Sequence, residues 1–452
     1  MKRITIIGGG ASGTLLAVNL LRAKVERPIA INLLEKSERV GLGVAYSTEK
    51  ETHLLNVPAS KMGAFPDDVE HFHRWLTANG YDYSPTDFVP RKVFGMYLRA
   101  VLNQAASTSP PTTAFCTIDD QATDIEVNQG LAQVQLRSGE TIASERVVLA
   151  FGNFLPPHPT VEDEAFTSAP KYFQNPWQPR VYESIEREDS VLIVGTGLSM
   201  VDVVLHLHST GHRGKITAIS TRGLLPAVHR LGFTYPSFYE EIESTTRVTD
   251  LMKTVMRHIV KAENDSSDWR AVIDSLRPHT QAIWQGLPTA EKRYFMQHLS
   301  RYWNTARHRM PPQAAEILDE LREAGKFQVV KGRLRSIKYI AGKKFSITYA
   351  AGGNVSGLSA DVLVNCIGSE SNFAKIEIPL IQNLLRKGFI RPDDVSLGLK
   401  ATPDGNIINR DNETSKIIST LGTALKGTLW ESTAIPEIRL QAQSLAIRLI
   451  AD

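Results

Sequence analysis

The chain has 452 residues, of which 42% are hydrophobic and 22% are charged, and its formal net charge is +3. Its length predicts two or three domains rather than one core, and so small a net charge gives no indication of nucleic-acid binding. No apolar run reaches the ~18 residues of a membrane span, and no signal peptide precedes the first expected strand. The two cysteines, Cys116 and Cys366, exclude a disulfide framework and a Cys-x-x-Cys redox pair. We therefore expect a soluble protein of the cytoplasm.

A glycine-rich loop lies close to the start of the chain. Residues 8–13 read Gly-Gly-Gly-Ala-Ser-Gly; they follow a short apolar run, residues 4–7, that predicts a strand, and they precede residues 14–21, which predict a helix. A strand, a Gly-x-Gly-x-x-Gly loop and a helix in this order indicate a dinucleotide-binding unit. The N-terminus of the helix offers free N–H groups and the positive end of its dipole to the phosphates.

Each glycine of this motif has a predicted task. Gly8 allows a tight turn, Gly10 lets the backbone approach the pyrophosphate, and Gly13 lets the helix pack closely on the strand. A second predicted strand, residues 30–34, ends at Glu35, whose carboxylate can accept a hydrogen bond from a ribose hydroxyl. A complete motif at the start of a chain is typical of flavoproteins that bind FAD.

The remaining elements of this first unit are predicted in chain order. They are a glycine-spaced loop over 40–46, helices over 69–78 and 91–106, a β-hairpin with a buried strand over 123–151 that ends at Gly152, and a proline-rich domain crossing over 156–159.

The pattern then repeats. A predicted strand over 191–194 leads into Gly195, Gly197 and a helix, and a second strand over 215–220 reaches Arg222. The later predicted segments are a helical insertion over 247–324, a hairpin over 333–349, a buried strand over 362–367, a strand over 416–421 that precedes Gly422, and a last helix over 434–451. The chain is therefore expected to carry two nucleotide-binding units.

The second motif differs from the first in two places. Met200 stands where the third glycine is expected, so helix and strand should pack less closely there. Arg222 stands where the first unit has Glu35; an arginine in that place can pair with the 2′-phosphate of NADP, which an acid would repel. The alternative is that Arg222 is an ordinary surface arginine. Two dinucleotide sites imply a relay in which a nicotinamide gives hydride to a flavin, so FAD and NADPH are the predicted cofactors.

Residues 55–58 (Leu-Asn-Val-Pro) and 65–67 (Phe-Pro-Asp) resemble the asparagine-containing segment of the class B flavin-containing monooxygenases. This resemblance implies that Asn56 faces the flavin and helps to hold its oxygenated form. The two-unit layout is similar, over nearly the whole chain, to flavoproteins with two dinucleotide-binding domains. A bacterial group of FAD/NAD(P)-binding proteins is also similar, in residues 54–58, 222–226, 307–309 and 428–431.

One expected feature of class B is missing. Its fingerprint Phe-x-Gly-x-x-x-His should precede the second glycine motif, but residues 171–177 read Lys-Tyr-Phe-Gln-Asn-Pro-Trp. This departure concerns the step that gates NADP more than it concerns the flavin site. It counts against a monooxygenase and leaves reduction of a diffusible acceptor as the alternative.

The helical insertion carries several histidines and arginines. Its histidines lack a ligand spacing such as His-Glu-x-x-His, so no metal site is predicted. Arg307, His308 and Arg309 either bind an anionic substrate or the phosphates of NADP, or form a salt-bridged helix end. The sequence leaves both interpretations open.

Together these patterns predict an α/β fold with two Rossmann-like dinucleotide-binding domains, each with a β-hairpin or meander, and a helical insertion. The expected FAD domain is discontinuous, residues 1–158 and 369–452, and encloses an NADP domain, residues 159–368. The predicted function is an FAD- and NADPH-dependent oxidoreductase, with a monooxygenase of a small soluble substrate as the first interpretation. The alternatives are an NADPH-dependent flavin reductase or diaphorase, and a non-catalytic flavoprotein redox sensor.

Asn56 is the predicted catalytic residue. The predicted cofactor-binding residues are Gly8, Gly10, Ala11, Ser12, Gly13, Glu35, Lys36, Gly43, Asn56, Gly152, Gly422 and Thr433 for FAD, and Gly195, Gly197, Ser199 and Arg222 for NADPH.

Overall fold

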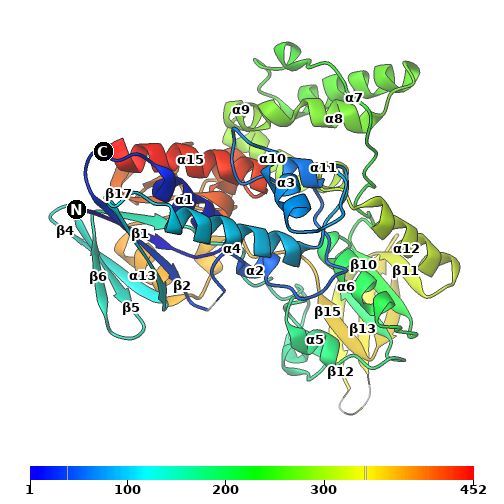
Figure 1. Ribbon diagram of the computed structural model, residues 1–452. Coiled ribbons are helices and arrows are strands. Elements are labelled where there is room, and N and C mark those ends of the chain that lie inside the picture. Colours follow the sequence, from blue (N-terminus) through cyan, green and yellow to red (C-terminus); the bar gives the residue numbers. More distant parts are fainter. Residues whose placement is uncertain (38, 341, 343, 452) are drawn as a thin grey trace.

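The computed structural model describes residues 1–37, 39–340, 342 and 344–451. It contains a six-stranded and a five-stranded sheet, both mainly parallel, and two antiparallel three-stranded sheets (Figure 1). Helices pack on both large sheets, as the predicted α/β fold requires. Among the described residues, no helix is long and apolar enough to cross a membrane.

The six-stranded sheet brings the two ends of the chain together. Its strands in spatial order are β16 (Asn406–Ile408), β17 (Thr414–Thr420), β7 (Arg146–Leu149), β1 (Lys2–Ile7), β2 (Ile29–Glu35) and β3 (Thr113–Asp119). All neighbouring pairs are parallel except β16 and β17. The C-terminal part of the chain therefore completes a sheet that the N-terminal part begins.

Both faces of this sheet are buried, which explains the continuous apolar run of β1. Ile4 and Ile6 lie in a core shared with three helices on one face, and Ile7 lies in a core on the opposite face. The three helices are α1 (Ala11–Arg22), α4 (Arg91–Ser107) and α15 (Ile435–Ala451). The shorter α2 (Gly43–Tyr46) and α3 (His71–Ala78) border α4.

The opposite face is covered by an antiparallel meander and a helix. The meander consists of β4 (Ala122–Asn128), β5 (Leu131–Leu136) and β6 (Thr141–Ser144), and the helix is α13 (Pro379–Lys387). The hairpin predicted over 123–151 thus gains a third strand, because residues after the second turn also pair with β5.

The five-stranded sheet repeats the order of the first. Its strands in spatial order are β11 (Phe327–Lys331), β10 (Ile216–Ser220), β9 (Val191–Val194), β15 (Val362–Asn365) and β8 (Tyr172–Phe173). The first four occupy the positions of β3, β2, β1 and β7, so the internal duplication inferred from the sequence is present. The helices that pack on this sheet include α5 (Pro179–Glu183), α6 (Leu198–Ser209) and α12 (Pro312–Glu323).

A second meander packs on the five-stranded sheet. It consists of β12 (Arg333–Tyr339), β13 (Phe345–Ala351) and β14 (Asn354–Ala360). It contains the predicted hairpin over 333–349, of which residues 341 and 343 lie outside the described part of the chain.

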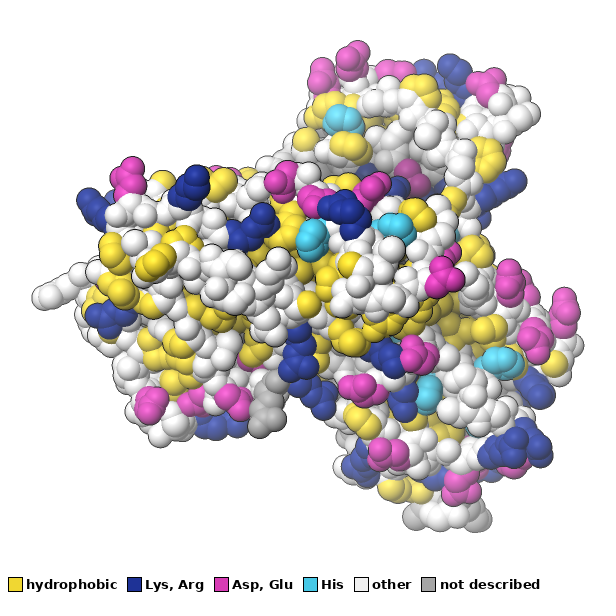
Figure 2. All heavy atoms as spheres, in the orientation of Figure 1, with side chains coloured by type: hydrophobic (Ala, Val, Ile, Leu, Met, Phe, Trp, Pro, Cys, Tyr) yellow, Lys and Arg dark blue, Asp and Glu magenta, His cyan; other side chains and the backbone are white. Residues whose placement is uncertain are grey.

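The predicted helical insertion lies between β10 and β11. Before α12 its helices are α7 (Val248–Asn264), α8 (Trp269–Ser275), α9 (Thr280–Gly286), α10 (Thr289–His298) and α11 (Ser300–Arg307). In Figure 1, α7 and α8 form a lobe that stands away from both large sheets. On the face shown in Figure 2, acidic and basic side chains are interspersed, as the small net charge leads one to expect.

Candidate functional site

Of the three glycines of the first Gly-x-Gly-x-x-Gly motif, the fold itself requires two and does not require the third. Gly8 has φ +114°, and a Cβ there would lie 2.4 Å from the carbonyl oxygen of Ala150; a Cβ on Gly13 would lie 1.9 Å from the carbonyl oxygen of Gly8. Gly10 has extended backbone, φ −71° and ψ −169°, and a Cβ there would meet only Gly43 at an ordinary 3.5 Å. Within the described protein, no contact or backbone angle requires glycine at position 10. A glycine that the protein itself does not require is expected where a ligand approaches the backbone closely.

Other predicted residues of the first unit gather around this loop. The Glu35 carboxylate accepts a hydrogen bond from the Gly9 N–H at 2.9 Å. A Cβ on Gly43 would lie 3.1 Å from Gly10, and a Cβ on Gly422 would lie 2.5 Å from the Ser12 hydroxyl.

The strand ends β7 and β17 meet at the same edge. The Thr423 hydroxyl, one residue after Gly422, donates to the carbonyl oxygen of Gly152 at 3.1 Å and to that of Phe151 at 2.8 Å. A free helix N-terminus, an acidic strand end and a gap at Gly10 are what the pyrophosphate and ribose of FAD require. The residues present therefore fit this group.

The second loop repeats the arrangement. Gly195 has φ +111°, and a Cβ there would lie 2.3 Å from the carbonyl oxygen of Cys366, whereas a Cβ on Gly197 would meet nothing within 4 Å. Ser199 lies in the first turn of α6, and Met200 is fully buried in the core below. The second loop therefore also leaves open the position that lies nearest a bound pyrophosphate.

A positively charged cavity of about 470 Å³ lies at the end of β10. Four of its lining residues are basic, namely Arg222, Arg301, Lys331 and Arg333, and none is acidic. We call it the cation pocket. Sequence reasoning identified Arg222 and missed the other three. Lys331 could have been inferred, because β10 and β11 are parallel neighbours and their carboxyl ends meet at one edge.

Replacing Arg222 with alanine is expected to weaken NADPH binding roughly ten- to a hundredfold and to spare NADH, because an arginine–phosphate pair contributes on the order of 1.5–3 kcal/mol. Dissociation constants from calorimetric titration measure this effect. Arg335→Ala is the matched control, since Arg335 is exposed on β12, two residues after the pocket residue Arg333, but does not line the pocket. Equal weakening of both coenzymes by Arg222→Ala would show that Arg222 contacts a part that they share.

Asn56 is held by its main chain. Its carbonyl oxygen accepts a hydrogen bond at 2.9 Å from the Nε2–H of His229, which comes from the segment after β10. Burial lowers the pKa of His229 to about 4, so the imidazole is neutral near pH 7 and its other ring nitrogen is an acceptor. The half-buried Asn56 side chain makes no hydrogen bond with the described protein. Sequence reasoning missed His229.

A buried ion pair joins the two units next to this segment. Arg91, at the start of α4, lies 2.9 Å from the Asp202 carboxylate on α6, and their side chains are 14% and 6% exposed. Arg91 also donates to the carbonyl oxygen of Leu54 at 2.9 Å. Burial raises the pKa of Asp202 to about 6 despite the neighbouring Arg91. Beside the pair, burial and then Arg91 lower the pKa of His53 to about 3.

The arginines at positions 307 and 309 are paired with acids. Arg307 Nε lies 3.1 Å from Glu431, with side chains that are 12% and 7% exposed, and Arg309 lies 2.8 Å from Asp274. Burial lowers the pKa of His308, which lies between them, to about 4. Of the two interpretations of this segment, the structure favours the salt-bridged helix end.

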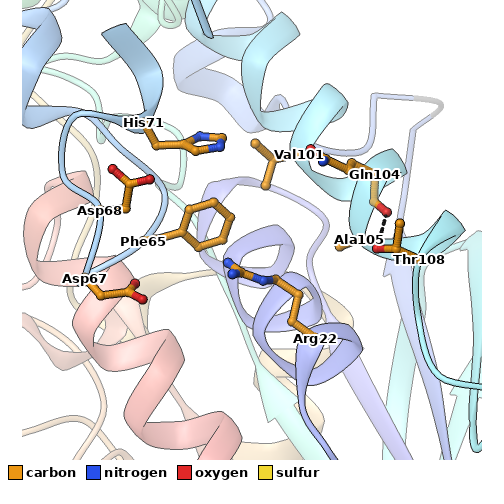
Figure 3. A pocket seen from close by; sticks show the side chains of 9 residues that line it. All are labelled: Arg22, Phe65, Asp67, Asp68, His71, Val101, Gln104, Ala105 and Thr108. Carbon is orange, nitrogen blue, oxygen red and sulfur yellow. Dashed lines mark hydrogen bonds between the residues drawn. The ribbon is translucent and has the colours of Figure 1, made fainter. Parts of the chain in front are cut away.

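A second cavity, of about 230 Å³, lies apart from both glycine loops. Figure 3 shows Phe65 facing Arg22, the last residue of α1, with Asp67 and Asp68 on the adjacent loop. The Arg22 guanidinium lies 4.0 Å from the centre of the Phe65 ring. The glycine loop lies at the other end of α1, so residues 65–67 do not reach the pyrophosphate loop.

The structure thus brings together Gly8 to Gly13, Glu35, Gly43, Gly152 and Gly422, and separately Gly195, Gly197 and Ser199. Arg222 lines the cation pocket. Lys36 is exposed after β2, and Thr433 is exposed before α15; among the described residues, no side-chain hydrogen bond or ion pair joins either of them to the first loop. For these two residues a role at the cofactor stays a prediction. No cluster of metal-ligating side chains occurs in the described ranges.

Residues 5–154 match the family model described as FAD-NAD(P)-binding. This segment of the chain is therefore similar to FAD-NAD(P)-binding proteins. The match covers the strand, the glycine loop, Glu35 and the first meander, and it confirms the dinucleotide-binding unit predicted at the N-terminus. The family description names FAD and NAD(P), so it confirms the predicted use of a flavin and a nicotinamide cofactor.

A curated relative matches about half of the chain. Protein YdhS of Escherichia coli (strain K12), described as uncharacterized, is 24% identical over 283 residues, which are 54% of this chain and 50% of YdhS. The match therefore spans about half the length of that relative.

Solved structures are similar over nearly the whole chain. The ornithine N-hydroxylase KtzI of Kutzneria sp. 744, solved with reduced FAD, NADP+ and L-ornithine, is 15% identical with a TM-score of 0.65 and covers 99% of this chain and 98% of its own. The bacillithiol disulfide reductase Bdr of Staphylococcus aureus is 13% identical with a TM-score of 0.57 and covers 100% and 99%. The fold, a flavoprotein fold with two dinucleotide-binding domains, is common to a monooxygenase and a reductase.

Proposed function

We propose that this protein is an FAD- and NADPH-dependent oxidoreductase that uses dioxygen to oxidise a small-molecule substrate. The first unit holds FAD and the second holds NADPH, with the division between domains at residues 158/159 and 368/369. When bound, FAD accepts hydride from the nicotinamide and passes the electrons on. Gly10, Glu35 and the N-terminus of α1 bind and orient it, and the cation pocket supports NADPH over NADH.

The observation that carries the proposal for dioxygen is the state of Asn56. His229 holds its main chain in place, whereas its amide has no partner in the described protein and can both donate and accept a hydrogen bond. If Asn56 faces FAD, as the resemblance to class B monooxygenases implies, its uncharged amide would offer a hydrogen bond without supplying an acidic proton, which suits chemistry that must exclude stray protons and water.

The positions of the two cysteines argue against thiol–disulfide chemistry. Cys116 is on β3 and Cys366 follows β15, in different sheets. Cys366 is buried, and its burial, together with Asp202, raises the pKa of its thiol. A thiol that stays protonated is a poor nucleophile. The cysteines therefore support a reaction with dioxygen rather than the reduction of a disulfide, the activity named for the structurally similar Bdr.

Asn56→Ala is expected to speed the return of oxidised flavin when the NADPH-reduced protein meets dioxygen, and to raise the yield of hydrogen peroxide per NADPH. Native protein should return to the oxidised spectrum in two separate phases, and the variant in one. Stopped-flow absorbance after anaerobic reduction measures the phases. Asn56→Asp, of equal size but without the N–H donor, should behave like Asn56→Ala.

Asn79→Ala is the matched control, because this exposed asparagine at the end of α3 bonds only to its own helix. A single phase that is identical in native protein and Asn56→Ala would leave a simple NADPH-dependent reductase or diaphorase. Absence of any flavin reduction by NADPH would instead favour the non-catalytic redox sensor.

A further inference from the structure

The cation pocket is assembled from two separate parts of the chain. Arg222, Lys331 and Arg333 come from the ends of β10 and β11 and the start of β12, whereas Arg301 comes from α11 in the helical insertion. In the part of the chain that the structure describes, none of the four side chains has an ion pair or hydrogen bond with the protein. Four positive charges around one cavity repel one another, and an anion bound between them would offset this repulsion. A phosphomonoester carries close to two negative charges at pH 7.

Helix α11 connects this pocket with the C-terminal segment. Arg301 lies in its first turn, and Arg307, its last residue, binds the Glu431 carboxylate through Nε at 3.1 Å and through a terminal nitrogen at 3.3 Å. Glu431 is 7% exposed and is followed by Ser432, a fully buried residue whose hydroxyl has no partner among the described atoms. The helix therefore spans from the cation pocket to a buried polar site just before α15.

A loop makes a second connection from the same pocket. Residues 221–229 begin at its wall and end at His229, which holds the main chain of Asn56. The loop and α11 are joined to each other, because the N–H of Ala227 donates to the carbonyl oxygen of Thr305 at 3.0 Å. A ligand that fixes one end of these two segments restricts the other.

We infer that the pocket binds the phosphomonoester of NADPH, that Arg301 of the insertion is a specificity-determining residue for it, and that this binding positions Asn56 and Glu431 through α11 and residues 221–229. The inference rests on the proposed use of NADPH and is independent of whether dioxygen is the acceptor. To the predicted role of Arg222 the inference adds a contact from the helical insertion, which couples the choice of coenzyme to the positions of Asn56 and Glu431.

The test uses the FAD-loaded full chain and 2′,5′-ADP, which carries the phosphomonoester but no nicotinamide. Calorimetry should show binding that 5′-ADP does not match, and hydrogen–deuterium exchange should slow in residues 300–310, 224–231 and 427–433. Arg301→Ala should weaken 2′,5′-ADP about tenfold and, at saturation, abolish the slowing in 224–231 and 427–433. Arg301→Lys should restore part of the affinity. Arg322→Ala, an exposed arginine of the insertion on α12 outside the pocket, is the control and should change neither.

Unchanged affinity and unchanged protection in Arg301→Ala would overturn the inference. So would equal protection by inorganic phosphate at the same concentration, which would assign the pocket to a free anion. Without ligand, hydrogen–deuterium exchange in Arg301→Ala should equal that of native protein. Faster exchange in α11 of the unliganded variant would show that Arg301 stabilises the helix itself, and would overturn the inference. Failure of the proposed function shows separately, as failure of NADPH to reduce the flavin while 2′,5′-ADP still slows exchange.

Discussion

Gly10→Val protein is expected to fold but to be isolated with little or no FAD. Position 10 has a backbone conformation that valine adopts readily, and the added Cβ would meet only Gly43 at 3.5 Å. The protein therefore has room for a Cβ at this position, and the methyl groups of valine would occupy the space through which the pyrophosphate approaches the loop. Absorbance of FAD released on denaturation, per mole of protein, gives the loading, and circular dichroism checks the fold.

Two further glycines make this result interpretable. Gly357→Val on β14, where the nearest atom to a Cβ is 3.9 Å away, should keep full FAD loading. Gly13→Val should fail to fold, since a Cβ there would lie 1.9 Å from the carbonyl oxygen of Gly8. A folded Gly10→Val protein with a full complement of flavin would show that the pyrophosphate does not cross Gly10.

Arg91→Met is expected to destabilise the protein by about 3–5 kcal/mol at pH 8, because it leaves the buried Asp202 carboxylate without its partner. The penalty should shrink at pH 5. In native protein the pKa of Asp202 is already raised to about 6, from an ordinary value of 3.8. The stability that this proton uptake contributes is complete below about pH 4 and is lost as pH rises through about 6. Without Arg91 the pKa rises further, so the variant loses more stability over the same range.

The difference in Tm between native protein and Arg91→Met, measured at pH 5 and pH 8, tests this expectation. Lys253→Met is the control: its pair with Asp250 has side chains 76% and 45% exposed, so removing it should cost less than about 0.5 kcal/mol at either pH. Equal destabilisation by Arg91→Met at both pH values would mean that the contact of Arg91 with the Trp177 ring, 5.0 Å from its centre, carries the stability instead.

Interactions between residues close together in the sequence could be predicted, whereas those between distant residues could not. Gly8, Gly13 and Glu35 act within one strand–loop–helix–strand unit, so their spacing along the chain is enough to assign them. Arg301 meets Arg222 only because a helical insertion folds back over the end of β10, and nothing in the sequence near either residue signals that approach.

The same limit applies to the groups between the two units. His229 and Asn56, like Asp202 and Arg91, are far apart in sequence and meet through the packing of one sheet and its helices against the other. Residues 65–67 were misplaced for a second reason. Their resemblance to a segment of the class B monooxygenases does not reveal that they contact the end of α1 away from the glycine loop. The third strand of each meander was missed because neither strand shows clear apolar alternation: β6 has only four residues, and β14 is mostly exposed.

The completion of the first sheet by β17 has a consequence for synthesis of the chain. The Thr420 hydroxyl of β17 donates to the carbonyl oxygen of Leu149 in β7 across 271 residues. At about 5–20 residues per second, a ribosome needs roughly 15–55 s to make the chain between them. During that time the second unit can fold as a whole, while β7 keeps an edge with unpaired backbone groups that can pair with another chain. The nascent protein is therefore most exposed to misassembly at β7, and this exposure ends when residues 414–420 emerge.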